Sequence, residues 1–116
     1  MITLNTAKGL VKVDGWGEVE ELPGFTNDID PKDHELKEIV GRYIFATTIP
    51  CGLSTCHSPH NRGYIVSTKA GQVTNIGNIC GVKYFGVEFE ASSKILEKNI
   101  RINEYRESIE SFLASI

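Results

Sequence analysis

Apolar positions along this chain follow two periods, and each period predicts a different kind of element. Residues 43–49 are rich in aromatic and β-branched residues, which predicts a strand that runs directly into Cys51. Residues 63–68 and 72–76 have the same character and flank a three-residue connection that contains glycine, which predicts a hairpin. Near the start of the chain, residues 10–13 predict a further short strand.

Two helices are expected in the N-terminal region. Asp14 is placed to cap a brief helix that Pro23 ends. A second helix is indicated by Asp30 as N-cap, Pro31 at the first helical position and Gly41 at the end. Such a helix would direct three apolar residues into the core: Leu36, Ile39 and Val40.

Helical signals return after the hairpin. Asn78 can cap a short helix that carries Cys80 in its first turn and ends near Gly86. A long helix is then expected from about Glu88 to Ile116. Within it, isoleucines recur every seven residues, with aromatic residues three positions after two of them: Ile95, Ile102, Ile109 and Ile116, with Tyr105 and Phe112.

This heptad pattern is typical of a coiled coil. β-branched residues at the first core position favour a parallel pair of helices. Lys98 interrupts the pattern, and the run is short. Two interpretations stay open: the apolar stripe packs on the domain of its own chain, or it pairs with a partner helix and makes a homodimer.

The cysteines and histidines are unevenly distributed. All three cysteines and two of the three histidines lie within residues 51–80. Thiolate and imidazole are the ligands that zinc prefers, in sets of four, and an odd number of cysteines in a reducing compartment favours a metal over disulfides. We therefore expect one structural zinc ion, with three ligands from the cysteines: Cys51, Cys56 and Cys80.

The fourth zinc ligand is either His57 or His60. His57 directly follows Cys56, and adjacent side chains point in different directions, so His60 is favoured. A catalytic zinc keeps an open position, whereas this set fills all four positions.

The order of strand, turn with two ligands, hairpin, and helix with a ligand in its first turn resembles the treble-clef zinc finger over residues 43–86. The resemblance implies zinc as cofactor and a non-catalytic binding role. The chain departs from the pattern in two places: its turn is Cys-x4-Cys, and Lys83 stands where a second helical ligand is common. A cysteine turn followed by Gly-x-x-Cys-Gly is also similar to uncharacterised proteins of phages and mobile elements.

Charge divides the chain into three segments. Residues 1–40 carry −5, residues 41–84 carry +4 with no acidic residue, and residues 85–116 carry −2. Phosphate binding would use the basic segment around the predicted metal, with tyrosines for stacking on bases. The candidates for nucleic-acid contact are Arg62, Lys69 and Lys83, with Tyr64 and Tyr84.

Enzymatic interpretations are less favoured. His60-Asn61 before a hairpin is similar to HNH nucleases, but that chemistry needs a histidine or asparagine ligand on the next helix and a histidine base. Residues 77–116 contain no histidine. A zinc deaminase would need a His-x-Glu sequence, which is missing.

These observations predict a small α+β domain with a zinc site over residues 1–87, followed by a C-terminal helix over 88–116. No signal peptide or membrane-spanning stretch is evident, so a soluble cytoplasmic protein without a membrane partner is expected. The pI is near 5.6, which is low for a nucleic-acid-binding domain. A protein-interaction or assembly module is therefore favoured over a nucleic-acid-binding finger, and an HNH-like nuclease comes third.

Overall fold

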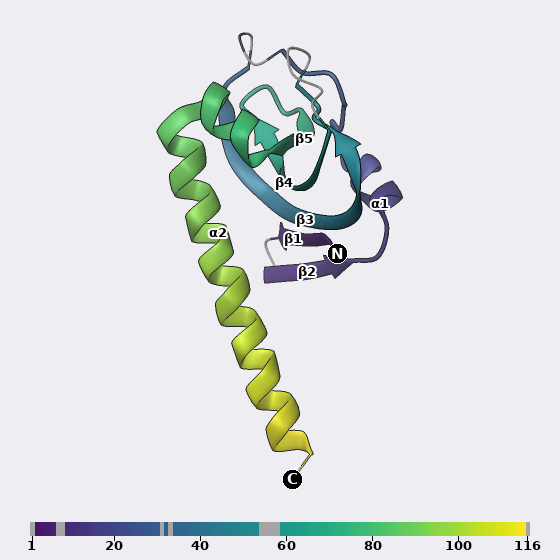
Figure 1. Cartoon of the computed structure of the whole chain (residues 1–116), viewed down its shortest axis with the longest axis vertical. Coiled ribbons are helices and arrows are strands. Elements are labelled where there is room, and N and C mark those ends of the chain that lie inside the picture. The colour runs from purple at the N-terminus through teal and green to yellow at the C-terminus, as the bar shows by residue number, and fades with distance from the viewer. Residues whose placement is uncertain (1, 7–8, 31, 33, 54–58, 116) are drawn as a thin grey trace.

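The computed structural model describes residues 2–6, 9–30, 32, 34–53 and 59–115. Within them the chain has an α+β fold, a five-stranded antiparallel sheet with a long C-terminal helix (Figure 1). The strands are β1 (Ile2–Thr6), β2 (Gly9–Val13), β3 (Leu36–Pro50), β4 (Pro59–Thr68) and β5 (Val73–Gly77). The helices are α1 (Trp16–Glu20) and α2 (Asn78–Ala114).

The sheet has the strand order β2-β1-β3-β4-β5, with β3 as its long curved centre (Figure 1). The predicted strands over residues 10–13, 43–49, 63–68 and 72–76 are confirmed, with β4 and β5 joined as the expected hairpin. β1 was not predicted from the sequence. It pairs with both β2 and β3, so its conformation depends on partners elsewhere in the chain.

The predicted helix over residues 30–41 is wrong, because residues 36–50 form β3. Four residues near the start of β3 are buried: Leu36, Ile39, Gly41 and Tyr43. Leu36 and Ile39 are three positions apart, whereas the buried residues of a regular strand are two positions apart. The pairing of β3 with β4 is irregular between Leu36 and Glu38 and again between Ile39 and Gly41. A β-bulge adds one residue to a strand and so breaks its period of two, which here imitates a helical spacing.

The predicted helix caps also differ in detail. Asp14 does not cap α1, whose N-cap is Gly15 with no side-chain hydrogen bond. Asp30 accepts the backbone N–H of Lys32 at 2.9 Å, which is a local turn instead of a helix start. Asn78 is the first residue of α2 and follows its N-cap, Gly77.

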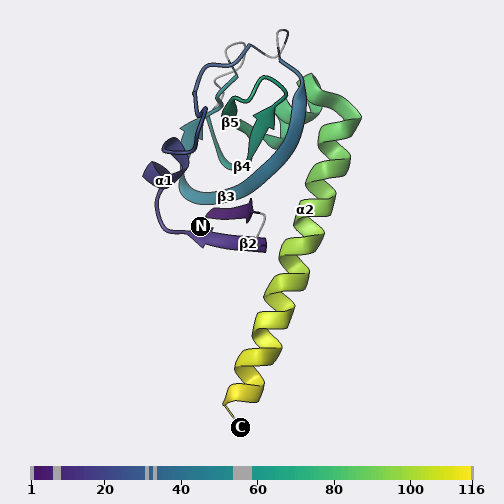
Figure 2. The ribbon, with the colours of Figure 1, turned by 180° about the vertical axis from the view of Figure 1, so that it is seen from behind.

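Both faces of the sheet are covered. Adjacent residues of a strand point to opposite faces, and Ile65 and Val66 accordingly belong to two different apolar clusters. The cluster with α1 contains Ile2, Val19, Tyr43 and Ile65, and Trp16 packs against it. The cluster with α2 includes Ile39, Cys51, Val66, Ile76, Phe89, Leu96 and Ile100. Figure 2, seen from behind, also shows α1 and α2 on opposite sides of the strands.

α2 is bent at Gly86, where the backbone leaves helical geometry with φ 65° and ψ −140°. The predicted end of a short helix near this glycine is confirmed as a kink between two arms, which we call the short arm (78–85) and the long arm (87–114). The bend brings the ring of Phe89 back over Gly81. A Cβ atom at residue 81 would lie only 2.2 Å from that ring.

The long arm runs along the sheet and continues past β2, so its C-terminal turns extend beyond the other elements (Figures 1 and 2). The overall extents of 54 × 27 × 24 Å reflect this projection. In the described part of the chain, no helix has the combined length and apolar character needed to span a membrane.

Candidate functional site

Cys51 lies directly after β3 and is buried in the cluster beneath α2. The backbone on its C-terminal side is held from two directions. The N–H of Gly52 donates to the carbonyl of Asn75 at 2.7 Å, and the carbonyl of Gly52 accepts the N–H of Ile29 at 2.8 Å. A Cβ atom at residue 52 would lie 1.9 Å from the Thr74 hydroxyl oxygen, so this close approach requires glycine.

His60 lies at the start of β4, where its Nε2 atom is hydrogen-bonded to the hydroxyl of Tyr43. The amide of Asn75 donates to the same hydroxyl at 3.3 Å and to the carbonyl of Pro50 at 2.8 Å. Burial raises the pKa of Tyr43, the Asn75 bond opposes this, and the nearby Cys51 adds to it. Tyr43 therefore fixes one ring nitrogen of the candidate ligand His60 and is close enough to the candidate ligand Cys51 for their charges to interact.

Cys80 lies in the first turn of α2, as predicted, and packs against the cluster that contains Cys51. It is disulfide-bonded, whereas the buried Cys51 does not take part in a disulfide. The ring of His60 lies beside Gly77, the N-cap of the same helix, at 3.3 Å from where a Cβ atom would be. Three of the predicted ligands thus come from the end of β3, the start of β4 and the start of α2, in one region of the fold.

Two predicted residues, Cys56 and the alternative ligand His57, lie outside the described residues. Among the residues that are described, no group of three or more His, Cys, Asp or Glu side chains is arranged to hold a metal. The four-ligand set of Cys51, Cys56, His60 and Cys80 therefore stays a prediction. Thiols at such positions have two chemical options, coordination of a metal as thiolates or oxidation to a disulfide.

The residues predicted to contact nucleic acid come from two parts of the fold, Arg62, Tyr64 and Lys69 from β4 and the residue after it, and Lys83 and Tyr84 from the short arm of α2. Arg62 lies within β4 and Lys69 directly follows its last residue, a separation of about 20 Å at the usual rise of a strand. Lys69 forms an exposed ion pair of 2.9 Å with Glu35, which raises the pKa of Lys69 and lowers that of Glu35. Lys83 lies over the ring of its neighbour Tyr84, 5.2 Å from the centroid.

A polar network between the sheet and α2 was not predicted. Arg42 donates to one oxygen of Glu97 at 2.8 Å, and the hydroxyl of Tyr64 donates to the other at 2.9 Å. Burial, together with the hydrogen bond to Glu97, raises the pKa of Tyr64 to about 12. The sequence did carry a signal for this face of α2, because charged residues recur at helical spacing: Glu90, Lys94, Glu97 and Arg101.

The predicted apolar stripe of α2 does not pack on the chain's own domain. The long arm contacts the sheet through Phe89, Leu96 and Ile100 instead. A helix turns about 100° per residue, so the stripe lies roughly opposite this contact face. Its described members are exposed: Ile95 by 61 %, Ile102 by 46 %, Tyr105 by 70 %, Ile109 by 42 % and Phe112 by 66 %, with Leu113 beside them at 61 %.

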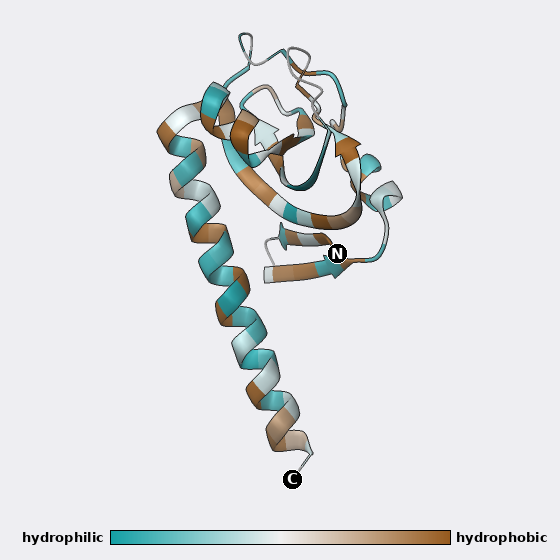
Figure 3. Cartoon of the chain, in the orientation of Figure 1, coloured by the Kyte–Doolittle hydropathy of each residue, from teal (hydrophilic) through white to brown (hydrophobic). Residues whose placement is uncertain are grey.

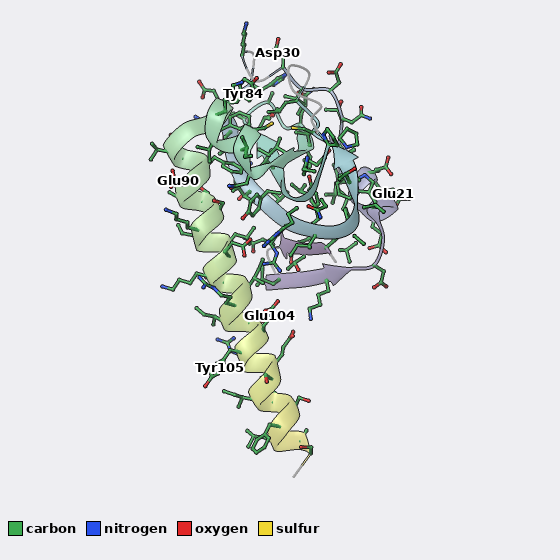
Figure 4. The ribbon with its side chains drawn as sticks, in the orientation of Figure 1. Glu21, Asp30, Tyr84, Glu90, Glu104 and Tyr105 are labelled. Atoms are coloured by element: carbon green, nitrogen blue, oxygen red, sulfur yellow. The ribbon has the colours of Figure 1, made fainter. Side chains whose placement is uncertain are left out.

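The figures show the same two-sided helix. In Figure 3 apolar residues continue along α2 to the end that projects beyond the sheet. In Figure 4 Tyr105 points away from the sheet, whereas Glu104 is on the side of the strands, where it lies 3.9 Å from Arg42. Ile116, the last predicted member of the stripe, lies outside the described residues.

Comparison with known proteins returns no matching family, no matching curated protein and no matching solved structure. The treble-clef resemblance of residues 43–86 therefore stays a prediction. Three features of the chain remain as candidate functional sites. They are the region with three candidate metal ligands, the charged network between the sheet and α2, and the exposed apolar stripe on α2.

Proposed function

We propose that this protein is a non-catalytic interaction module that assembles with a second copy of itself through the long arm of α2. The observation that carries the proposal is the outward stripe of Ile95, Ile102, Tyr105, Ile109 and Phe112, which is exposed although it is apolar. A helix with one apolar face buries it on its own domain. This helix has a second apolar face that its own domain does not cover.

A second helix of the same kind fits this stripe. The heptad spacing of Ile95, Ile102 and Ile109 provides the interlocking positions of a two-stranded coiled coil. Removing one isoleucine side chain from water stabilises an assembly by roughly 1.5–3 kcal/mol, so several such layers outweigh the cost of association. The stripe also includes Ile109 and Phe112 in the C-terminal turns of α2, which project past the sheet (Figures 1 and 2), so a partner helix there would not meet the strands.

The charges favour antiparallel pairing of the two helices. In a parallel pair Lys98 would meet Lys98 of the second copy, and Arg101 would meet Arg106 across the seam. Both contacts bring like charges together. In an antiparallel pair the layers become Ile95 with Phe112, Ile102 with Tyr105, and Ile109 with Lys98, whose aliphatic stem can cover the isoleucine while its ammonium group reaches water.

The predicted zinc ion has a structural role in this proposal. Cys51, Cys56, Cys80 and His60 would join the end of β3, the start of β4 and the start of α2, and so fix the short arm relative to the sheet. Support comes from the shared cluster of Cys51 and Cys80 and from the bond between His60 and Tyr43. A metal-bound histidine usually has its second ring nitrogen held by such a partner.

Sedimentation of the full chain at micromolar concentration tests the assembly. Wild-type protein should be a dimer, and Ile102→Asp combined with Ile109→Asp should be a folded monomer with an unchanged circular dichroism spectrum. The matched control is Ile79→Asp combined with Val87→Asp. These two residues are also aliphatic and β-branched, are each 82 % exposed, and lie on α2 outside the stripe.

The control variant should remain a dimer. A monomeric wild-type protein would contradict assembly with a second copy. So would a control variant that dissociates as fully as the stripe variant, because the effect would then follow from added charge alone.

A further inference from the structure

A cavity of about 680 Å³ lies between the sheet and the kinked helix. Its sheet wall includes Arg42, Arg62 and Tyr64, and its helix wall includes Lys94, Glu97 and Arg101. Arg42, Arg62 and Tyr64 share the α2 face of the sheet, because Arg42 pairs with Tyr64 and alternate residues of β4 point the same way. The volume lies within the range of small-molecule sites.

The lining carries more positive than negative charge. Four of its residues are cationic, Arg42, Arg62, Lys94 and Arg101, and two are acidic, Glu90 and Glu97. Both oxygens of Glu97 are engaged, one by Arg42 and one by Tyr64. Glu90 is engaged by Lys94 at 3.1 Å. Two positive charges are therefore left over once the carboxylates are paired.

The surplus is carried by Arg62 and Arg101, which come from opposite walls of the cavity. Among the described residues neither guanidinium group has an ion-pair or hydrogen-bond partner. A guanidinium group presents a planar set of N–H donors that matches the oxygens of phosphate or carboxylate two at a time. The pair Lys94–Glu90 is exposed and worth little, so Lys94 can turn to a third anionic oxygen.

The remaining lining is partly apolar. Val82 of the short arm and Ile44 of β3 lie beside the charged groups, and the ring of Tyr64 contributes an aromatic wall. We propose that this cavity binds a small organic phosphate monoester, with the phosphate dianion between Arg62 and Arg101 and the organic group against Val82 and Ile44. The two unpaired guanidinium charges equal the charge of such a phosphate near pH 7.

Titration of the full chain with phenyl phosphate, followed by NMR and calorimetry, tests the proposal. Phenyl phosphate combines a dianionic phosphate with a compact apolar ring, and it should bind saturably, more tightly than inorganic phosphate and more tightly than succinate. Arg62→Gln and Arg101→Gln should each weaken binding by about tenfold, because each removes a charge-assisted bidentate contact. The matched control is Arg106→Gln, an exposed arginine on α2 outside the cavity lining, which should change the affinity by less than about twofold.

Three results would overturn the proposal. Phenyl phosphate without saturable binding would remove the site. Succinate bound as tightly as phenyl phosphate would show a general dianion site, and inorganic phosphate bound as tightly would show that the apolar wall recognises nothing. The titration is repeated on the Ile102→Asp, Ile109→Asp variant, which keeps every residue of the cavity, so failure of the assembly proposal and failure of this one give different results.

Discussion

Arg42 of β3 and Glu97 of α2 form an ion pair of 2.8 Å between side chains that are 55 residues apart in the sequence. The side chain of Arg42 is only 12 % exposed and that of Glu97 29 %, so water screens the pair weakly. Tyr64 donates to the same carboxylate, which makes Glu97 the common acceptor for two strands of the sheet. These polar contacts join the long arm of α2 to β3 and β4, in addition to the apolar contacts that Phe89, Leu96 and Ile100 make with the sheet.

Glu97→Gln should lower the free energy of unfolding by about 1–3 kcal/mol, because it removes the nearer of two counter-charges from the largely buried Arg42 and leaves only Glu104, at 3.9 Å. Urea denaturation of the full chain measures this loss. Glu107→Gln is the matched control: Glu107 is on the same helix and pairs with Lys12 at 3.5 Å, with both side chains more than half exposed. Its loss should stay below about 0.5 kcal/mol, and equal losses would show that burial of the Arg42 pair does not matter.

Gly81→Ala should destabilise the fold by about 1–3 kcal/mol, because the added Cβ atom would force the fully buried Phe89 ring out of position. Gly17→Ala serves as the control within α1, since nothing lies within 4 Å of its added Cβ atom. That change should be neutral or stabilising, because alanine favours a helix over glycine by about 1 kcal/mol. Thermal unfolding compares the two variants, and a Gly81→Ala protein as stable as wild type would contradict the close packing of the kink.

The free energy of unfolding should fall as the pH rises above 10. Folding raises the pKa of Tyr64 to about 12, and burial raises that of Tyr43 as well. Between the unfolded pKa near 10 and the folded value, the folded state keeps a proton that the unfolded state has lost, so alkali favours unfolding. Urea midpoints between pH 9 and 11.5 should show a shallower slope for Tyr64→Phe than for wild type, with Tyr105→Phe as the control. An unchanged slope in Tyr64→Phe would contradict the assignment.

Local residue patterns predicted the elements that local residues determine. The glycine-containing turn between β4 and β5 and the break at Gly86 were both found from single residues at special positions. β1 was missed because its pairing partners, β2 and β3, lie elsewhere in the chain. The false helix over residues 30–41 arose because bulges in β3 spaced Leu36 and Ile39 three residues apart.

The sequence predicted which residue types belong to each candidate site, but not which way those residues face or which charged residues they pair with. The sequence pattern predicted the apolar stripe of α2, but it did not predict which face of the helix packs on the sheet. In the fold Leu96 is buried against the sheet, and the adjacent Ile95 is therefore exposed. In the sequence, residues 41–84 carry only positive charges and no acidic partner for them. In the fold Arg42 and Lys69 each meet an acidic residue from another segment, Glu97 and Glu35.

Protein prepared under reducing conditions should contain one zinc ion per chain. Native mass spectrometry with metal analysis measures this, and Cys51→Ser, Cys56→Ser or Cys80→Ser should each abolish binding and unfold residues 43–86, since structural zinc contributes on the order of 10 kcal/mol. His60→Ala should weaken binding more than His57→Ala. Metal-free protein of unchanged stability, in which Cys80 remains in a disulfide after mild reduction, would show that oxidation and not zinc joins this region.

The direction of helix pairing can be separated from pairing itself by one change of charge. In a parallel dimer Arg106 faces Arg101 of the second copy, so Arg106→Glu would replace a repulsion by an attraction and tighten the dimer. In the antiparallel dimer that we propose, Arg106 lies beside the neutral Asn99 of the second copy, and the same change should alter the dissociation constant by less than about twofold. Sedimentation equilibrium of wild-type and Arg106→Glu protein at low salt measures the difference. A dimer that tightens by about fivefold or more, and that loses this gain at high salt, would show that the helices run parallel.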